Sequence, residues 1–184
     1  TYPVIDTDLQ IITRCAVKTI GNNTVRVKVS KSDPPTVLTA LEAASLTGYV
    51  AAIIPAGVVF QIVNVAADKL YIDADIYYNG EYAATISDSV IESINAYLEG
   101  LPADGTVEIS ALQNAINDTP GVTDVKLNEV RARQDSVAFA SATVVYKLST
   151  GVNLRIWNTV SASMVEETTV GNTFADTLNF IAAS

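Results

Sequence analysis

Residues 70–130 constrain the fold more than any other part of the chain, because strand-like and helix-like spacings of apolar residues alternate there in short units. From Leu70 to Tyr78 every second residue is apolar or aromatic, which is typical of a half-buried strand, and Asn79-Gly80 marks a turn. From Ile86 to Glu99 the apolar residues recur every three or four positions, which predicts an amphipathic helix of about four turns. The segment therefore begins as a strand, a turn and a helix.

Capping residues support two helix starts. Thr85 is followed three residues later by Asp88, and Ser110 is followed three residues later by Gln113. A Ser or Thr with an acidic or amide residue at this spacing is typical of a capping box. We therefore expect one helix to begin at each place, the second one being short and running through Ile116.

Short strands separate and follow these helices. The candidates are Thr106 to Ile109, Val122 to Arg133 with Val125 and Leu127 facing inward, and a long alternating strand from Ser136 to Leu148. The alternation predicts an α+β fold with antiparallel or mixed sheets and short helices on one side. We expect a ferredoxin-like central unit with β-rich flanking segments.

The flanking segments extend this pattern. Thr13 to Ser30 predicts a β-hairpin that turns at Gly21-Asn22-Asn23, and Thr36 to Leu46 predicts a helix that Gly48 stops. Gly48 to Val65 has strand composition and is divided at Pro55. Near the C-terminus we expect strands around 152–157 and 161–165, then a terminal helix that includes Phe174, Leu178 and Ile181.

These elements predict three regions. Residues 1–66 form an N-terminal region of hairpin, helix and strand, 67–135 a central β-α-β-α-β unit, and 136–184 a β-rich C-terminal segment. No apolar run is long enough for a membrane span, because Pro55, Gly57 and Gln61 interrupt the richest one.

Charge and residue types exclude several classes of function. The net charge is −9 and the 11 basic residues are spread thinly, so nucleic acid is not an expected partner. The chain has no histidine, which removes the commonest general base and metal ligand. Cys15 is the single cysteine, and we expect it to be a small buried residue on a strand. We expect no cofactor and no metal, and catalysis would have to rest on carboxylates, Lys or Tyr.

One order of short motifs points to a family. A helix ends at Tyr97-Leu98 and is followed by the loop Pro102 to Gly105, the strand Val107 to Ile109, the helix Leu112 to Ile116 and the turn Gly121-Val122-Thr123-Asp124-Val125. This order resembles the C-terminal part of the Baseplate J family, the wedge proteins of contractile phage tails and related injection machines. Members carry a helical N-terminal region that is not identified in this chain, and the resemblance does not explain the tail after Ser136.

The resemblance implies a structural subunit of a phage or prophage tail baseplate, or of a related contractile injection system. Such a protein is not an enzyme. Its partners are other baseplate or tail proteins, with self-association left open, and it is located in the virion after assembly in the host bacterial cytoplasm. It acts through extended protein–protein interfaces.

The outward residues of the central strand are candidates for such an interface. Asp73 and Asp75 lie two apart, so they can hold a cation, act as an acid–base pair or simply form a solvated face. Tyr71, Tyr77 and Tyr82 gather around the same turn, and tyrosine is enriched at protein interfaces.

Trp157, the only tryptophan, follows Arg155 on an expected strand and serves either as a core residue or as an interface anchor. Glu166-Glu167 is most simply a solvated acidic pair.

Two other classes of function compete with the baseplate. A cell-surface adhesin or carbohydrate-binding module would need a shallow aromatic groove around Tyr71, Tyr77 and Trp157. A hydrolase would need at least two convergent carboxylates among Asp73, Asp75 and Glu99.

Overall fold

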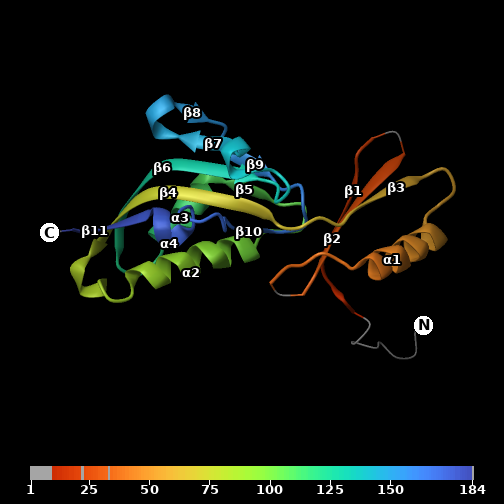
Figure 1. The fold of residues 1–184 in the computed structure, drawn as a ribbon, viewed down its shortest axis with the longest axis horizontal. Helices are drawn as coiled ribbons and strands as arrows, with labels where there is room; N and C mark the ends of the chain where they lie inside the picture. The colour runs from red at the N-terminus through yellow and green to blue at the C-terminus, as the bar shows by residue number, and fades with distance from the viewer. Residues whose placement is uncertain (1–9, 22, 33, 184) are drawn as a thin grey trace.

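A computed structural model describes residues 10–21, 23–32 and 34–183. These residues form two lobes, which lie end to end along the longest axis of the molecule (Figure 1). We call residues 10–63 the N-lobe and residues 68–183 the C-lobe.

The N-lobe is a three-stranded sheet with one helix. Strands β1 (Ile12–Thr19) and β2 (Thr24–Lys31) form an antiparallel hairpin, and β3 (Val59–Val63) pairs with β2 in parallel after the crossover helix α1 (Ala40–Ile53). The predicted hairpin is confirmed. Gly21 has φ +97°, the left-handed region that a glycine turn requires.

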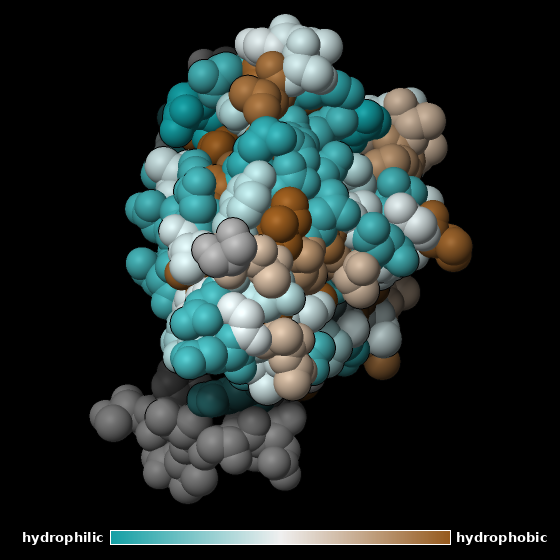
Figure 2. All heavy atoms as spheres, turned by 90° about the vertical axis from the view of Figure 1, so that its left-hand side faces the viewer, coloured by the Kyte–Doolittle hydropathy of each residue, from teal (hydrophilic) through white to brown (hydrophobic). Residues whose placement is uncertain are grey.

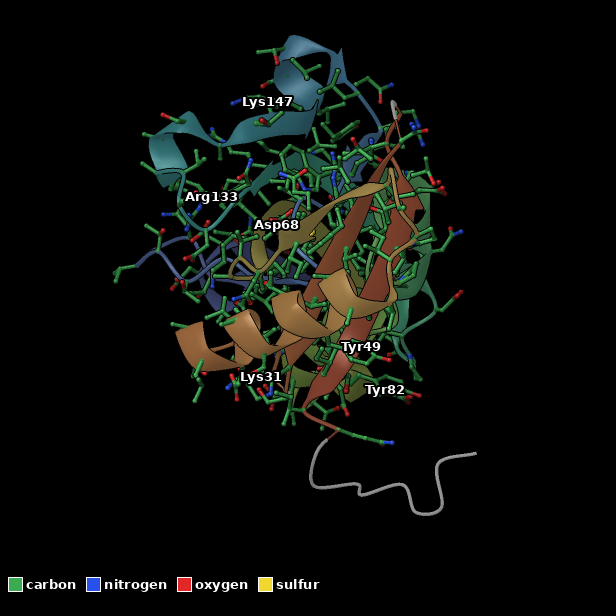
Figure 3. The ribbon with its side chains drawn as sticks, turned by 90° about the vertical axis from the view of Figure 1, so that its right-hand side faces the viewer. Lys31, Tyr49, Asp68, Tyr82, Arg133 and Lys147 are labelled. Carbon is green, nitrogen blue, oxygen red and sulfur yellow. The ribbon has the colours of Figure 1, made fainter. Side chains whose placement is uncertain are left out.

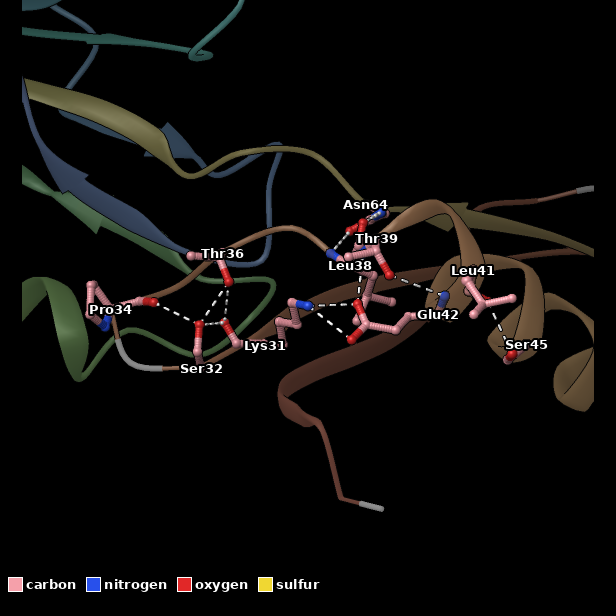
Figure 4. Close-up of polar contacts among 10 residues, drawn as sticks. All are labelled: Lys31, Ser32, Pro34, Thr36, Leu38, Thr39, Leu41, Glu42, Ser45 and Asn64. Atoms are coloured by element: carbon pink, nitrogen blue, oxygen red, sulfur yellow. Dashed lines mark hydrogen bonds and ion pairs between the residues drawn. The ribbon is translucent and has the colours of Figure 1, made fainter. Parts of the chain in front are cut away.

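Helix α1 differs from its prediction at both ends. It begins at Ala40, runs through Gly48 and ends at Ile53, so the strand predicted for the segment just after Gly48 is wrong. The start is fixed locally, because Thr39 and Glu42 form a capping box in which each side chain accepts a hydrogen bond from the other residue's backbone N–H (Figure 4). A single glycine weakens a helix by only about 1 kcal/mol, which packing against β2 and β3 outweighs.

The C-lobe has one main sheet. Its strands have the order β10-β4-β6-β7-β8, and β11 also pairs with β4. The elements are β4 (Asp68–Asn79), η2 (Gly80–Tyr82), α2 (Ile86–Glu99), β5 (Thr106–Glu108), α3 (Ile109–Asn117), β6 (Val122–Arg133), η3 (Phe139–Ser141), β7 (Thr143–Lys147), η4 (Leu148–Thr150), β8 (Val152–Asn153), β9 (Ile156–Asn158), β10 (Met164–Glu166), α4 (Phe174–Thr177) and β11 (Leu178–Ala183).

The α+β class is confirmed, with mixed and antiparallel sheets and short helices, whereas the ferredoxin-like detail is not. The predicted bounds of α2 and β6 are confirmed, but both capping boxes are wrong. Thr85 precedes α2 with a non-extended backbone and caps no N–H group, and α3 begins one residue before Ser110.

The C-terminal predictions need correction. The long strand expected over 136–148 is reduced to β7, because η3 interrupts the segment. The expected terminal helix is only the four residues of α4, after which the chain turns into β11 beside β4. Strand pairing with β4 overrides the weak helical spacing there.

The main core lies between the sheet and α2, α3 and α4. The inward side chains of β4 are fully buried against the apolar stripe of α2, and each such side chain contributes roughly 1.5–3 kcal/mol. The N-lobe core is much smaller, with Val27, Val29 and Leu38 as its buried apolar residues among those that the structure describes. The C-lobe is therefore the stable body of the molecule.

Polar contacts join the two lobes. Lys28 Nζ lies 2.6 Å from Asp104 Oδ1 and also donates to the carbonyl of Thr159, and Lys18 Nζ lies 3.0 Å from Asp104 Oδ2. Arg14 donates to the carbonyl of Leu101 at 3.1 Å. We call these contacts the joint. The hydrogen bond from Lys28 lowers the pKa of Asp104.

Two side chains lie in environments opposite to those expected. Cys15 is exposed, because α1 leaves β1 uncovered. Glu167 is not solvated: its side chain is 1% exposed and forms a bidentate pair with Arg133, with N–O distances of 2.6 and 2.7 Å. Burial by itself raises the pKa of Glu167, but the bonds from Arg133 and Thr169 outweigh it and hold the pKa at about 2.

In the described part of the chain, no helix has the length and apolar character that crossing a membrane requires.

Candidate interaction surface

The outward face of the main sheet brings together four of the residues singled out in the sequence. Tyr71, Asp73, Asp75 and Tyr77 alternate along β4 with fully buried residues, so their side chains leave the sheet on the side opposite to α2. We call this face, with the facing residues of β6 and β7, the outer sheet face. The other two candidates lie elsewhere.

Strand β6 supplies the second row of this face. Tyr71 pairs with Arg131, Asp73 with Glu129 and Asp75 with Lys126. A register shift at Asn128 reverses the alternation after Leu127 and turns Glu129 and Arg131 outward. The Asn128 side chain donates to Asp73 Oδ1 at 3.2 Å.

Opposite charges on the outer sheet face are paired within the molecule. Lys126 Nζ lies 3.0 Å from Asp75 Oδ2, and Asn179 donates to Asp75 Oδ1 at 3.2 Å. The hydrogen bond from Lys126 lowers the pKa of Asp75. Asp75 is thus an ionised partner of a lysine, and it has no environment that would prepare it for proton transfer.

Glu129 is the centre of a second cluster. Arg131 Nε lies 2.6 Å from Glu129 Oε1, and Lys147 Nζ lies 2.8 Å from Glu129 Oε2. Burial by itself raises the pKa of Glu129, but these two hydrogen bonds outweigh it and lower the pKa below its ordinary value. The two cations also offset the repulsion between Glu129 and its cross-strand neighbour Asp73.

An aromatic pair extends the face toward η3. The rings of Tyr71 and Phe139 meet edge to face, with centroids 5.3 Å apart and planes at 62°. The Arg131 guanidinium carbon lies 5.9 Å from the Tyr71 centroid and 5.5 Å from that of Phe139. These contacts hold Tyr71 and Arg131 in place before any partner binds.

Tyr82 and Trp157 do not join this face. Tyr82 is 39% exposed at the far end of β4 and lies over Gly121. Trp157 packs against the main core and donates from Nε1 to Asp68 Oδ2 at 3.3 Å. Asp68 is itself fully buried, and burial raises its pKa.

The arrangement is suited to contact and not to an evident reaction. A recess of about 450 Å³ lies between Asp73, Lys126, Asn128 and Lys147. Its two lysines are paired with Asp75 and Glu129, and Asp73 accepts a hydrogen bond from the Asn128 amide. Glu99, at the end of α2, lies on the opposite side of the sheet from Asp73. Among the residues that the structure describes, no group of three or more His, Cys, Asp or Glu residues is placed to hold a metal ion.

Sequence reasoning did not identify Arg131, Glu129, Phe139 and Lys147 as members of this face. Period-two extrapolation from Val125 places Glu129 and Arg131 inward, because it cannot anticipate the register shift. At the end of the C-lobe far from α1 the surface is mostly hydrophilic, with scattered hydrophobic residues (Figure 2).

The fold is α+β, and the outer sheet face is a polar and aromatic surface whose side chains already contact one another. Residues 71–143 match the family model of the Baseplate J-like protein C-terminal domain. This segment, from β4 to the start of β7, is similar to that domain, and the resemblance carried by the sequence motifs is confirmed. No curated protein matches the chain. Baseplate J-like proteins are structural phage components, so the match indicates a structural role related to the tail baseplate.

Proposed function

We propose that this chain is a wedge component of a phage tail baseplate, or of a related contractile injection system, and acts through protein–protein interfaces without catalysis. The family match over 71–143 carries the proposal. It includes all of β4 from Tyr71 onward and all of β6, so the outer sheet face lies largely inside the matched domain.

The outer sheet face supports a contact role. Tyr71, Arg131 and Phe139 are held against one another, so a partner that binds there orders few further side chains. Tyr and Arg are the residue types most enriched at the centres of interfaces. We propose Tyr71, Asp73, Asp75 and Tyr77 as contact residues on this face, and Tyr82 and Trp157 as contact residues outside it.

Partners are other tail or baseplate proteins, and the chain joins them in the host bacterial cytoplasm before it is located in the virion. The division at 66/67 and 135/136 remains a prediction. The adhesin alternative needs one aromatic groove, yet Trp157 packs against the core while Tyr71 faces outward.

Co-purification tests the proposal. The tagged chain is expressed with the products of its flanking genes, and complexes are separated by size and identified by mass spectrometry. We expect tail proteins to co-elute with it, and antibody-labelled tail particles to carry it at the baseplate. Binding to glycans on an array, with no assembly among tail proteins, would contradict the proposal.

The contact face is tested separately. Asp73→Arg reverses the charge of a side chain that points away from the core and contacts the amide of Asn128. The substitution should therefore leave the core intact. We expect it to lower recovery of the partner at least about tenfold. Glu92→Arg on the exposed surface of α2 is the matched control and should have no effect. Equal recovery with both variants would remove the outer sheet face from the proposal.

A further inference from the structure

Helix α1 is apolar on all sides but is covered on only one. Glu42 is its single charged residue, and none of its 14 residues is buried. Leu41 is 78% exposed, Ile53 61% and Tyr49 59%. A helix that is hydrophobic all round is normally buried all round, so the outward side of α1 lacks a cover.

Strand β1 also lacks a cover on the side of the sheet where α1 lies. Val17 and Cys15 pair with the buried Val27 and Val29, so all four point toward the α1 side. Val17 is nevertheless 66% exposed and Cys15 is exposed as well. One helix, about 10 Å wide, covers about two strands, and α1 covers β2 and β3.

Helix and strand enclose an apolar groove. It has a volume of about 320 Å³, and Ile11, Ile12, Leu41, Ser45 and Tyr49 are among the residues that line it. Figure 3 shows α1 in front of the N-lobe sheet, and Tyr49 is labelled there. We call the outward side of α1 together with this groove the α1 face.

The α1 face is electrically neutral. Glu42 is paired with Lys31 at 2.6 Å, and Arg14, Lys18 and Lys28 are engaged in the joint. Most acidic residues of the chain lie instead in 67–184. A second copy can therefore approach the α1 face without the repulsion that two acidic C-lobes would produce.

The rest of the chain offers no comparable helix for this face. The outward side of α2 carries Asp88, Glu92 and Glu99, and α3 and α4 are short. Among the α-helices of the described residues, α1 is the one that exposes large hydrophobic side chains; α3 is also uncharged, but its large apolar residues are buried. A neutral apolar groove beside a neutral apolar helix is self-complementary, which is the requirement of a two-fold interface.

We propose that the α1 face binds the α1 face of a second copy of this chain, with each α1 lying beside the other and covering β1 of the partner. Gly48 supports close approach, because a Cβ there would meet nothing within 4 Å in the single chain. A specific interface buries about 1,000 Å² or more in total. Helix α1 is about 21 Å long, and its exposed Leu41, Tyr49 and Ile53, with Val17 and Ile11 beside it, are the apolar residues that each copy would bury.

The oligomeric state of the full chain tests this proposal. We expect sedimentation equilibrium to show a dimer at concentrations of about 1–100 μM, a range typical of modest interfaces. Leu41→Glu places a charge in the centre of the α1 face and should raise the dimer dissociation constant at least about 100-fold. Circular dichroism verifies that the variant is folded.

Val170→Glu is the matched control, because Val170 is 95% exposed and lies in the C-lobe between β10 and α4. It should dimerise like the unmodified chain. A chain that stays monomeric at all these concentrations would overturn the proposal, and so would a folded Leu41→Glu variant that dimerises normally. The α1 face lies outside residues 71–143, so dimerisation and co-assembly with tail proteins can fail independently.

Discussion

At the residue scale, the turn at Gly121 requires a glycine for two reasons: its backbone conformation and its close contact with Tyr82. Its φ is +95°, and a Cβ there would lie 2.5 Å from Cγ of Tyr82. We expect Gly121→Ala to lower the free energy of unfolding by about 2–4 kcal/mol, the sum of backbone strain and overpacking. Urea denaturation measures this change.

Gly171 provides the matched control, because its φ is +77° and nothing lies within 4 Å of an added Cβ. Gly171→Ala should therefore show only the backbone part, about 1–2 kcal/mol. In a Tyr82→Gly background, which also removes the Tyr82 Cβ that would lie 2.9 Å from the added Cβ, Gly121→Ala should cost no more than this. An equal loss for both glycines in the unmodified chain would show that Tyr82 does not restrict the turn.

The pair of Glu167 and Arg133 makes stability depend on pH. The folded pKa of Glu167 is about 2, below its ordinary value of 4.5, so the pair stabilises the fold fully above pH 4.5. This contribution is lost as the pH falls through about 2. Glu167→Gln leaves a charged, buried Arg133 and should cost roughly 3 kcal/mol at pH 7.

Unfolding curves at several pH values check this dependence. The difference between the unmodified chain and Glu167→Gln should shrink steadily from pH 5 to pH 2. Glu92→Gln, at an exposed position on α2, should follow the unmodified chain at every pH. A difference that does not change with pH would assign the loss to packing instead of charge.

At the element scale, the starts of α1 and α2 differ although both follow a threonine. Thr39 accepts from the backbone N–H of Glu42, whereas Thr85 makes no side-chain cap hydrogen bond with α2. We expect Thr39→Ala to lower the stability of α1 by about 1 kcal/mol and Thr85→Ala to have almost no effect on α2. Amide hydrogen exchange in the first turn of each helix measures both changes. Equal effects would contradict the difference between the two caps.

Elements with a strong pattern could be predicted from the sequence. The β1–β2 hairpin and α2 are predicted because alternation or helical spacing marks each one. The bounds of β6 are predicted as well, although its alternation reverses at Asn128. The extent of α1 was not, because Gly48 and the β-branched residues near its end resemble a strand, and pairing partners decide the outcome. The same applies to β11, whose place beside β4 is a contact between residues far apart in sequence.

The candidate site could be predicted only in part, because part of it depends on strand pairing that the sequence does not reveal. Alternation along β4 correctly places Tyr71, Asp73, Asp75 and Tyr77 on one face. It does not reveal that Asn128 shifts the register of β6, or that Arg131 then reaches Tyr71 and Phe139. The acidic pair at 166–167 is predicted to be solvated, because the sequence does not reveal that Glu167 forms an ion pair with Arg133, a residue far away along the chain.

At the scale of the whole molecule, the joint determines how the N-lobe presents the α1 face relative to the outer sheet face. Lys28 is 3% exposed and Asp104 25%, so the pair is shielded on the lysine side, whereas Lys18 at 65% exposure adds little. The chain connection between the lobes is short, running from β3 to β4. The orientation of the lobes therefore depends mainly on Lys28, Asp104 and the carbonyls of Leu101 and Thr159.

Asp104→Asn tests whether this joint holds the lobes together. It removes the anionic partner of a buried lysine, so we expect faster hydrogen exchange around 101–105 and 159, faster proteolysis at 64–67 and a larger radius of gyration in solution. Asp118→Asn, at an exposed position after α3, should change none of these. Because Lys28 lowers the pKa of Asp104, the joint should be intact above pH 3.8 and loosen as the pH falls further. If Asp104→Asn leaves exchange and proteolysis unchanged, the carbonyl contacts suffice, and Asp104 serves only to neutralise Lys28.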